Sequence, residues 1–116
     1  MGNFEFLESN WSELAKLGDL AEKYLYSDTN TCFLKIGYLA EHIVEYMLAY
    51  DGISKPENDN THANRIKLLK RNDLLPREID NILYVLRKSR NDAAHNGMES
   101  LDIAKDNLQL AYDLAS

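Results

Sequence analysis

The sequence is poor in the residues that punctuate short strands. It has two prolines and five glycines in 116 residues, so it offers few of the turn signals that separate the strands of a β-sandwich or barrel. No apolar run approaches the roughly 20 residues that a membrane-spanning helix needs. The first six residues, Met1–Phe6, hold neither the basic region nor the apolar region of a signal peptide. These absences argue against an all-β fold and against a membrane location.

Cysteine and chemical motifs are also scarce. The single cysteine, Cys32, rules out an internal disulfide and suits a reducing compartment, so we expect a cytoplasmic protein with Cys32 buried in its core. There is no P-loop, dinucleotide fingerprint, HExxH or paired CxxC motif. The histidines His42, His62 and His95 lie in different segments, and their spacing gives no support to a zinc site with Cys32. We therefore expect no metal and no cofactor in this chain.

Positive charge is concentrated in one segment. The net charge is −6, but residues 65–90 carry +5, whereas residues 1–64 carry −7 and residues 91–116 carry −4. The whole chain should repel a nucleic acid at long range, and the basic segment could still attract one locally. Lys70 and Arg71 are candidates for nucleic-acid contact. The competing interpretation is that these cations, with Arg65, Lys67 and Arg77, line solvated helix faces.

Apolar residues recur at helical spacing along most of the chain. Local signals mark the helix ends: Asn10 with Glu13 at the first start, Asp51–Gly52 at the second end, Pro76 as the first residue of the fourth helix, Asn96–Gly97 as its end, and Ser100 as the cap of the fifth. The expected helices cover residues 10–26, 31–50, about 60–69, 76–96 and 100–115.

These five helices with short connections predict a single all-α domain over residues 1–116, an up-and-down helical bundle. The only obvious loop is Ser54–Asn60, which is too short to separate two domains. The last helix reaches Ala115–Ser116 without a cap signal. This favours the N-terminal fragment of a longer protein, with a natural end as the alternative.

The segment from Arg87 to Gly97 differs from the rest because it joins three cations, Arg87, Lys88 and Arg90, to Asn91 and His95. Arg87, Asn91 and His95 step by four and share one helix face. Arg90 and His95 are five residues apart, roughly 140° around an ideal helix. One straight helix therefore does not aim both at one point, whereas two copies related by a dyad could. The competing interpretation is a helix C-terminus whose cations complement the dipole.

Arg90 and His95, separated by four residues with a polar residue directly after the arginine, resemble the signature of the HEPN superfamily of helical nucleotide-binding domains. The segments Phe4–Leu7, Ala21–Cys32 and Leu74–Ile79 resemble the N-terminal helical region of type I restriction enzyme R (HsdR-type) subunits. This resemblance covers nearly all of the chain and implies a HEPN-like bundle.

The resemblance also implies roles. HEPN ribonucleases cut RNA without a metal in a cleft to which both copies of a dimer contribute. In this chain His95 would be the general acid and base, Arg90 would stabilise transition-state charge, and Asn91 would orient the phosphate or the histidine. Arg87 and Lys88 would hold the strand backbone.

Two functions follow as expectations. The first is a non-catalytic helical module of a restriction R subunit, which docks other subunits or domains of the complex or contacts DNA or RNA. The ATPase and the metal-dependent nuclease of such a subunit would lie elsewhere in the polypeptide. The second is a metal-independent ribonuclease that acts as a homodimer through Arg90 and His95. A weaker third is nucleotide binding without turnover.

Overall fold

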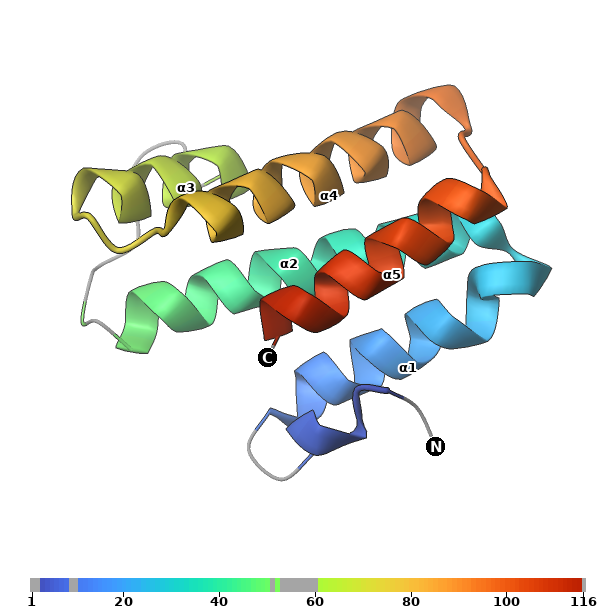
Figure 1. The fold of residues 1–116 in the computed structure, drawn as a ribbon, viewed down its shortest axis with the longest axis horizontal. Helices are drawn as coiled ribbons and strands as arrows, with labels where there is room; N and C mark the ends of the chain where they lie inside the picture. The colour runs from blue at the N-terminus through green and yellow to red at the C-terminus, as the bar shows by residue number, and fades with distance from the viewer. Residues whose placement is uncertain (1–2, 9–10, 51, 53–60, 116) are drawn as a thin grey trace.

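The chain folds into a bundle of five α-helices. The computed structural model describes residues 3–8, 11–50, 52 and 61–115, and these contain no strand. In Figure 1, α1 and α2, α2 and α4, and α4 and α5 are neighbours that run antiparallel. The prediction of an all-α bundle of about five helices is confirmed. The elements are the 3-10 turn η1 (Glu5–Leu7) and the helices α1 (Ser12–Ser27), α2 (Thr29–Tyr50), α3 (His62–Arg71), α4 (Arg77–Asn96) and α5 (Leu101–Ala115).

Helix α2 is the centre of the bundle, because it contacts each of the other four helices. Nine of its 22 residues are buried, and at about 100° per residue they cover roughly half of the helix circumference. A buried face of this width gives several other helices room to pack on α2. The remaining helices each bury one stripe of side chains against α2 or against a helix that packs on it.

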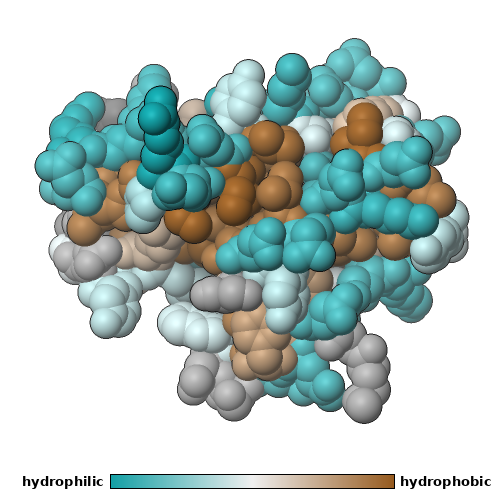
Figure 2. Space-filling model, viewed as in Figure 1, coloured by the Kyte–Doolittle hydropathy of each residue, from teal (hydrophilic) through white to brown (hydrophobic). Residues whose placement is uncertain are grey.

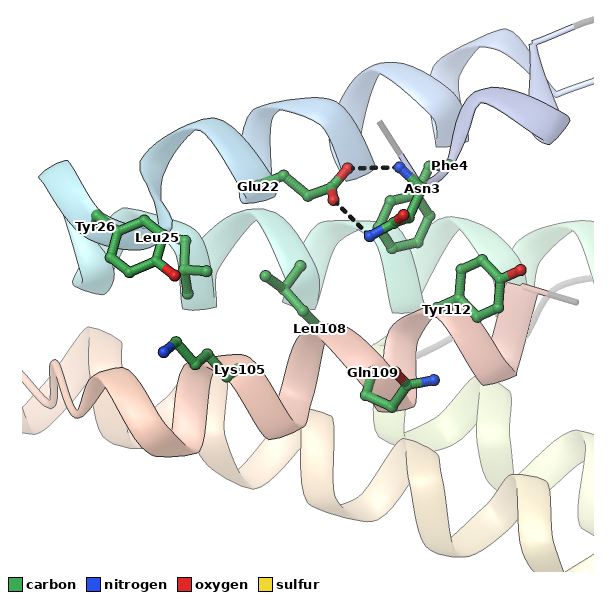
Figure 3. Close-up of a pocket in the computed structure, with 9 residues that line it drawn as sticks. All are labelled: Asn3, Phe4, Glu22, Leu25, Tyr26, Lys105, Leu108, Gln109 and Tyr112. Carbon is green, nitrogen blue, oxygen red and sulfur yellow. Dashed lines mark hydrogen bonds between the residues drawn. The ribbon is translucent and has the colours of Figure 1, made fainter. Parts of the chain in front are cut away.

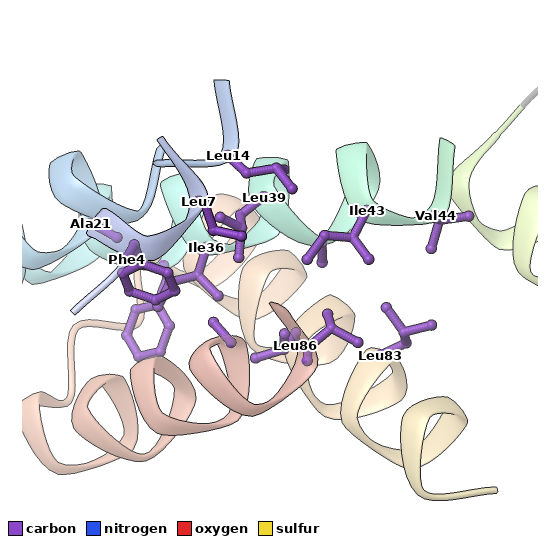
Figure 4. Close-up of a cluster of buried hydrophobic side chains, with 14 of the residues drawn as sticks. Phe4, Leu7, Leu14, Ala21, Ile36, Leu39, Ile43, Val44, Leu83 and Leu86 are labelled. Atoms are coloured by element: carbon purple, nitrogen blue, oxygen red, sulfur yellow. The ribbon is translucent and has the colours of Figure 1, made fainter. Parts of the chain in front are cut away.

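The core is continuous from the N-terminal segment to α5. Phe4 and Leu7 pack with Ile36 and Leu39 of α2, and Leu83 and Leu86 of α4 point into the same interior (Figure 4). Cys32 is fully buried, as expected, and burial raises the pKa of its thiol to about 11. The thiol is therefore protonated at neutral pH and unsuited to nucleophilic attack.

Local signals fix most helix ends close to their predicted places. The Thr61 side chain accepts a hydrogen bond from the Asn64 N–H (3.2 Å) and begins α3. Gly97 ends α4 in the left-handed conformation, with φ of 66°. Ser100 Oγ accepts from the Ile103 N–H (3.4 Å) at the start of α5. Pro76 is the N-cap of α4 rather than its first residue.

The connection between α1 and α2 is shorter than predicted. The expected break over Ser27–Asn30 contracts to Asp28 alone, because its carboxylate accepts hydrogen bonds from the N–H (3.2 Å) and the hydroxyl (2.6 Å) of Thr31 and caps α2. Helix α1 begins at Ser12 after Trp11. The predicted cap Asn10, Asp51 of the predicted stop and the loop Ser54–Asn60 lie outside the described residues.

The surface combines polar rims with an apolar band. Figure 2 shows apolar side chains gathered across the middle of one face, with hydrophilic groups on either side. Among the described helices, none is both long enough and apolar enough to cross a membrane.

Asn30 ties the start of α2 to the end of α4. Its side-chain amide donates to the carbonyl oxygens of Ala93 (2.8 Å) and Met98 (3.1 Å), at the point where α4 ends at Gly97. Two carbonyls at a helix terminus are thereby satisfied by one partly buried side chain.

We expect Asn30→Ala to lower the free energy of unfolding by about 1–2 kcal/mol, because it removes both hydrogen bonds and leaves the two partly buried carbonyl oxygens without this donor. Urea unfolding measures the change. Asn72→Ala is the matched control, because the Asn72 amide donates only to the nearby Leu68 carbonyl at the surface (2.8 Å). Equal losses in the two variants would contradict this assignment.

Candidate functional site

A polar hollow opens where α2, α3 and α4 meet. It has a volume of about 420 Å³. We call it the arginine hollow, because three of its lining residues are arginines from two different helices. The lining residues are Glu41 of α2, Thr61, His62, Ala63 and Arg65 at the start of α3, and Arg87, Arg90 and Asn91 of α4.

Arg90 reaches the hollow by crossing α2 at a glycine. A Cβ atom on Gly37 would collide with the Cβ and Cγ atoms of Arg90, so the arginine stem occupies the space that any other residue would fill. The guanidinium lies 5.8 Å from the centre of the Tyr38 ring, and its Nη2 is 3.7 Å from Glu41 Oε1. Its buried Nε has no hydrogen-bond partner among the described residues. Arg90 is thus held in place by packing more than by a close ion pair.

The other two arginines differ in their pairing. Arg65 Nη1 donates to Glu45 Oε1 at 2.9 Å, which ties α3 to α2. Arg87 makes no ion pair or hydrogen bond within the part of the chain that the structure describes. Three guanidinium groups and one carboxylate, that of Glu41, therefore line the hollow, which is cationic in a protein of net charge −6.

The N-terminus of α3 forms one wall of the hollow. The Thr61 hydroxyl and carbonyl accept from the N–H groups of Asn64 and Arg65, so the N–H groups of His62 and Ala63 have no acceptor within the helix. Free N–H groups and the positive end of the helix dipole favour an anion at this place.

His62 is the titratable group that the arginines affect most. Burial lowers its pKa to about 4, with repulsion from Arg65, Arg87 and Arg90 as further causes and the Glu45 carboxylate opposing them. Its buried Nδ1 has no hydrogen-bond partner among the described residues. The imidazole is therefore neutral at pH 7.

The structure brings together only part of the predicted site. Arg87, Arg90 and Asn91 line the arginine hollow, whereas His95 is exposed and is not among the lining residues. This arrangement agrees with helix geometry, which separates Arg90 and His95 by a wide angle around the axis of α4. A single copy of the chain does not place Arg90 and His95 in one cavity.

The remaining predicted contacts lie outside the hollow. Lys88 and Arg71 are exposed. Lys70 lies in the groove between α3 and α4, with its Nζ 3.2 Å from Asp80 Oδ2. His42 is partly exposed on α2, with its Nδ1 4.0 Å from Glu13 Oε2.

Sequence reasoning missed the contribution of α3 to the site. Thr61, His62 and Arg65 line the hollow, and their only signals are a cap residue at a helix start and the first cation of the basic segment. Nothing local relates them to Arg87 and Arg90, which follow more than twenty residues later.

Two other cavities hold none of the predicted site residues. A pocket of about 560 Å³ lies between α1, α5 and the N-terminal segment, where Glu22 accepts hydrogen bonds from the N–H (3.1 Å) and the side-chain amide (3.0 Å) of Asn3 (Figure 3). An apolar groove of about 390 Å³ runs beside Trp11 and Tyr46. Across the described ranges, no three His, Cys, Asp or Glu side chains are grouped so that they could hold a metal ion.

The fold and the site define a small all-α bundle with a cationic hollow at the junction of three helices. Residues 19–116 match the family described as a domain of unknown function, DUF4145, and the chain belongs to this family. No match is found among curated proteins or among solved structures. The family description names no activity.

The lowered pKa of His62 predicts a specific pH dependence of stability. Between about pH 6.5 and pH 4 the unfolded chain binds a proton at His62 and the folded chain does not, so stability falls as the pH falls through this range. Between pH 7 and pH 4, the free energy of unfolding of His62→Gln should fall by about 1–2 kcal/mol less than that of the parent. Partial exposure of the His62 ring to solvent keeps this difference small. Urea unfolding at several pH values measures it. Parallel pH profiles for the two proteins would refute the prediction.

The contact between Gly37 and Arg90 predicts a reversal of sign. Gly37→Ala should destabilise the parent by about 1–3 kcal/mol, because the new methyl group overpacks against the Arg90 stem. In an Arg90→Gly background the Cβ, Cγ and Cδ atoms that crowd this position are all absent, and alanine is favoured over glycine inside a helix by about 1 kcal/mol. The same substitution should then stabilise the protein.

Thermal and urea unfolding of the four proteins in this cycle give the coupling energy. Gly37→Ala in an Arg87→Ala background is the control, and there it should still destabilise. A loss of similar size in all three backgrounds would show that Arg90 is not the group that requires glycine at this position.

Proposed function

We propose that this chain is a non-catalytic helical module that contacts nucleic-acid phosphates through the arginine hollow. The observation that carries the proposal is the convergence of Arg65, Arg87 and Arg90 with the N-terminus of α3 on one cavity. Guanidinium groups form paired hydrogen bonds with phosphate oxygens, and helix N-termini offer free N–H groups to the same atoms. Both features select for an anion.

A purely structural role explains part of the cluster. The pair between Arg65 and Glu45 ties α3 to α2, and the contact between Arg90 and Glu41 ties α4 to α2. Arg87 has no such role within the described chain, yet it brings a third cation to the same hollow. With Glu45 beside Arg65 and Glu41 beside Arg90, the charge of Arg87 is the one that no carboxylate of the described chain balances, which supports a bound anion.

The resemblance to restriction R subunits supplies the wider proposal. In that setting the module would belong to a cytoplasmic defence protein, with other subunits or domains of a restriction complex as protein partners and DNA or RNA as the ligand. Phosphate contact by arginines needs no cofactor. The ATPase and nuclease chemistry would come from the rest of the polypeptide.

The second candidate function is a metal-independent ribonuclease that acts as a homodimer. The adjacent residues Arg90 and Asn91 both line the hollow, which favours it. It needs His95 as the acid and base, and His95 is exposed outside the cavity. Only a second copy of the chain could bring the His95 imidazole to the Arg90 guanidinium. The single-chain geometry therefore supports binding more than cleavage.

Arg87→Ala should weaken nucleic-acid binding on the order of tenfold at low salt, because it removes a charged contact to phosphate. The plot of log affinity against log salt should become less steep by about one unit. Fluorescence anisotropy with labelled oligonucleotides in EDTA measures both quantities. Lys16→Ala, at an exposed position on α1, is the control and should match the parent.

The same samples test for cleavage. Intact RNA after incubation with the parent at high protein concentration is the expected result. If the parent cleaves RNA and His95→Ala does not, the ribonuclease hypothesis is correct instead. No salt-dependent binding to any oligonucleotide would refute both functions.

A further inference from the structure

A second cavity continues the arginine hollow along the seam between α3 and α4. It has a volume of about 440 Å³ and shares Ala63 and Arg87 with the hollow. Lys67 lines it from α3, and Tyr84 lines it from α4. The two cavities together form one groove that leads from three arginines to an aromatic ring.

Tyr84 is exposed in a way that core packing does not explain. It is 56% exposed, and within the described chain it makes no ring contact and no hydrogen bond. Tyr84 and Arg87 are three residues apart, so they lie on one face of α4 about 4.5 Å apart along its axis. An open ring therefore stands beside the one arginine of the hollow that lacks a protein partner.

The charges along the groove are ordered. At the end near the hollow, Arg87 is joined by Arg65 and Arg90. At the far end the cation Lys70 is neutralised by Asp80, with 3.2 Å between Nζ and Oδ2. A phosphate is therefore attracted to the hollow and gains little at the far end. Between these ends the groove is lined by the cation Lys67 of α3 and the ring of Tyr84 of α4, which suits a nucleotide whose base lies over the ring.

We propose that this groove binds a single-stranded nucleic acid, with a phosphate in the arginine hollow and a neighbouring base stacked on Tyr84. The inference rests on the proposed function and adds to it the strandedness of the ligand and a base-contacting residue. A base inside a duplex is already stacked on its neighbours, whereas an unpaired base is free to stack on an aromatic ring. A duplex would therefore offer phosphates to the hollow but no free base to Tyr84.

The test compares three probes of equal length: a single-stranded oligothymidine, the same strand with every base removed, and a duplex. The variants are Tyr84→Ala, Tyr84→Phe and Arg87→Ala. Tyr50→Ala is the matched control, because Tyr50 is an exposed tyrosine, 87% accessible, that lines the separate apolar groove. Circular dichroism confirms that each variant is folded.

On the oligothymidine, Tyr84→Ala should bind at least about fivefold more weakly than the parent, whereas Tyr84→Phe should retain parental affinity because the ring remains. On the base-free strand and the duplex, Tyr84→Ala should equal the parent. Tyr50→Ala should equal the parent on all probes. An oligouridine of the same length in place of oligothymidine should give the same pattern, since stacking does not read the sugar.

Two results would overturn the inference. If Arg87→Ala weakens binding and Tyr84→Ala does not, the base contact is wrong and the phosphate contact stands. If Tyr84→Ala weakens binding to the duplex and the base-free strand as strongly as to the oligothymidine, the residue does not act by stacking. Failure of the parent to bind any probe would instead remove the proposed function, and the inference with it.

Discussion

The packing of α2 against every other helix is the constraint on which the rest of the structure depends. Because α2 must touch α4 closely along its length, one residue at the crossing has to be glycine, and Gly37 gives that space to the stem of Arg90. The same contact that closes the core therefore sets the position of a charged group. A cation that would otherwise sample many rotamers in water is held against a helix, near Tyr38 and Glu41. This reduces the entropy lost when an anion binds.

The hollow is a product of three helices, and each contributes a different physical property. Helix α4 contributes arginines on one face, α3 contributes its N-terminal N–H groups and Arg65, and α2 contributes the carboxylate of Glu41 and the glycine. Burial beside three guanidinium groups keeps His62 neutral, so it adds no further charge to the cavity at pH 7. Positive charge is thus concentrated at the hollow in a protein whose net charge is negative. An anionic ligand would be attracted by the local charge of the hollow, although the net negative charge of the whole protein would repel it at longer range.

Much of the fold follows from signals that act within one or two turns of helix. Thr61, Gly97 and Ser100 mark helix ends because a cap or a left-handed turn depends on neighbouring residues alone. The site follows such signals less well. Arg87, Arg90 and Asn91 could be selected because they form a local cluster, but nothing near them in the sequence indicates that α3 would bring its N-terminus alongside. Gly37 gave no signal at all, since a glycine inside an apolar helix does not show which side chain will cross it.

The burial of Cys32 has a consequence for how the motions of this protein can be followed. A protonated thiol in the centre of the core reacts with alkylating reagents only while the structure around it is open. Because there is one cysteine in the whole chain, each modification reports a single position. The labelling rate therefore measures how often α2 separates from its neighbours, and Cys32 is a natural probe of local opening in the core.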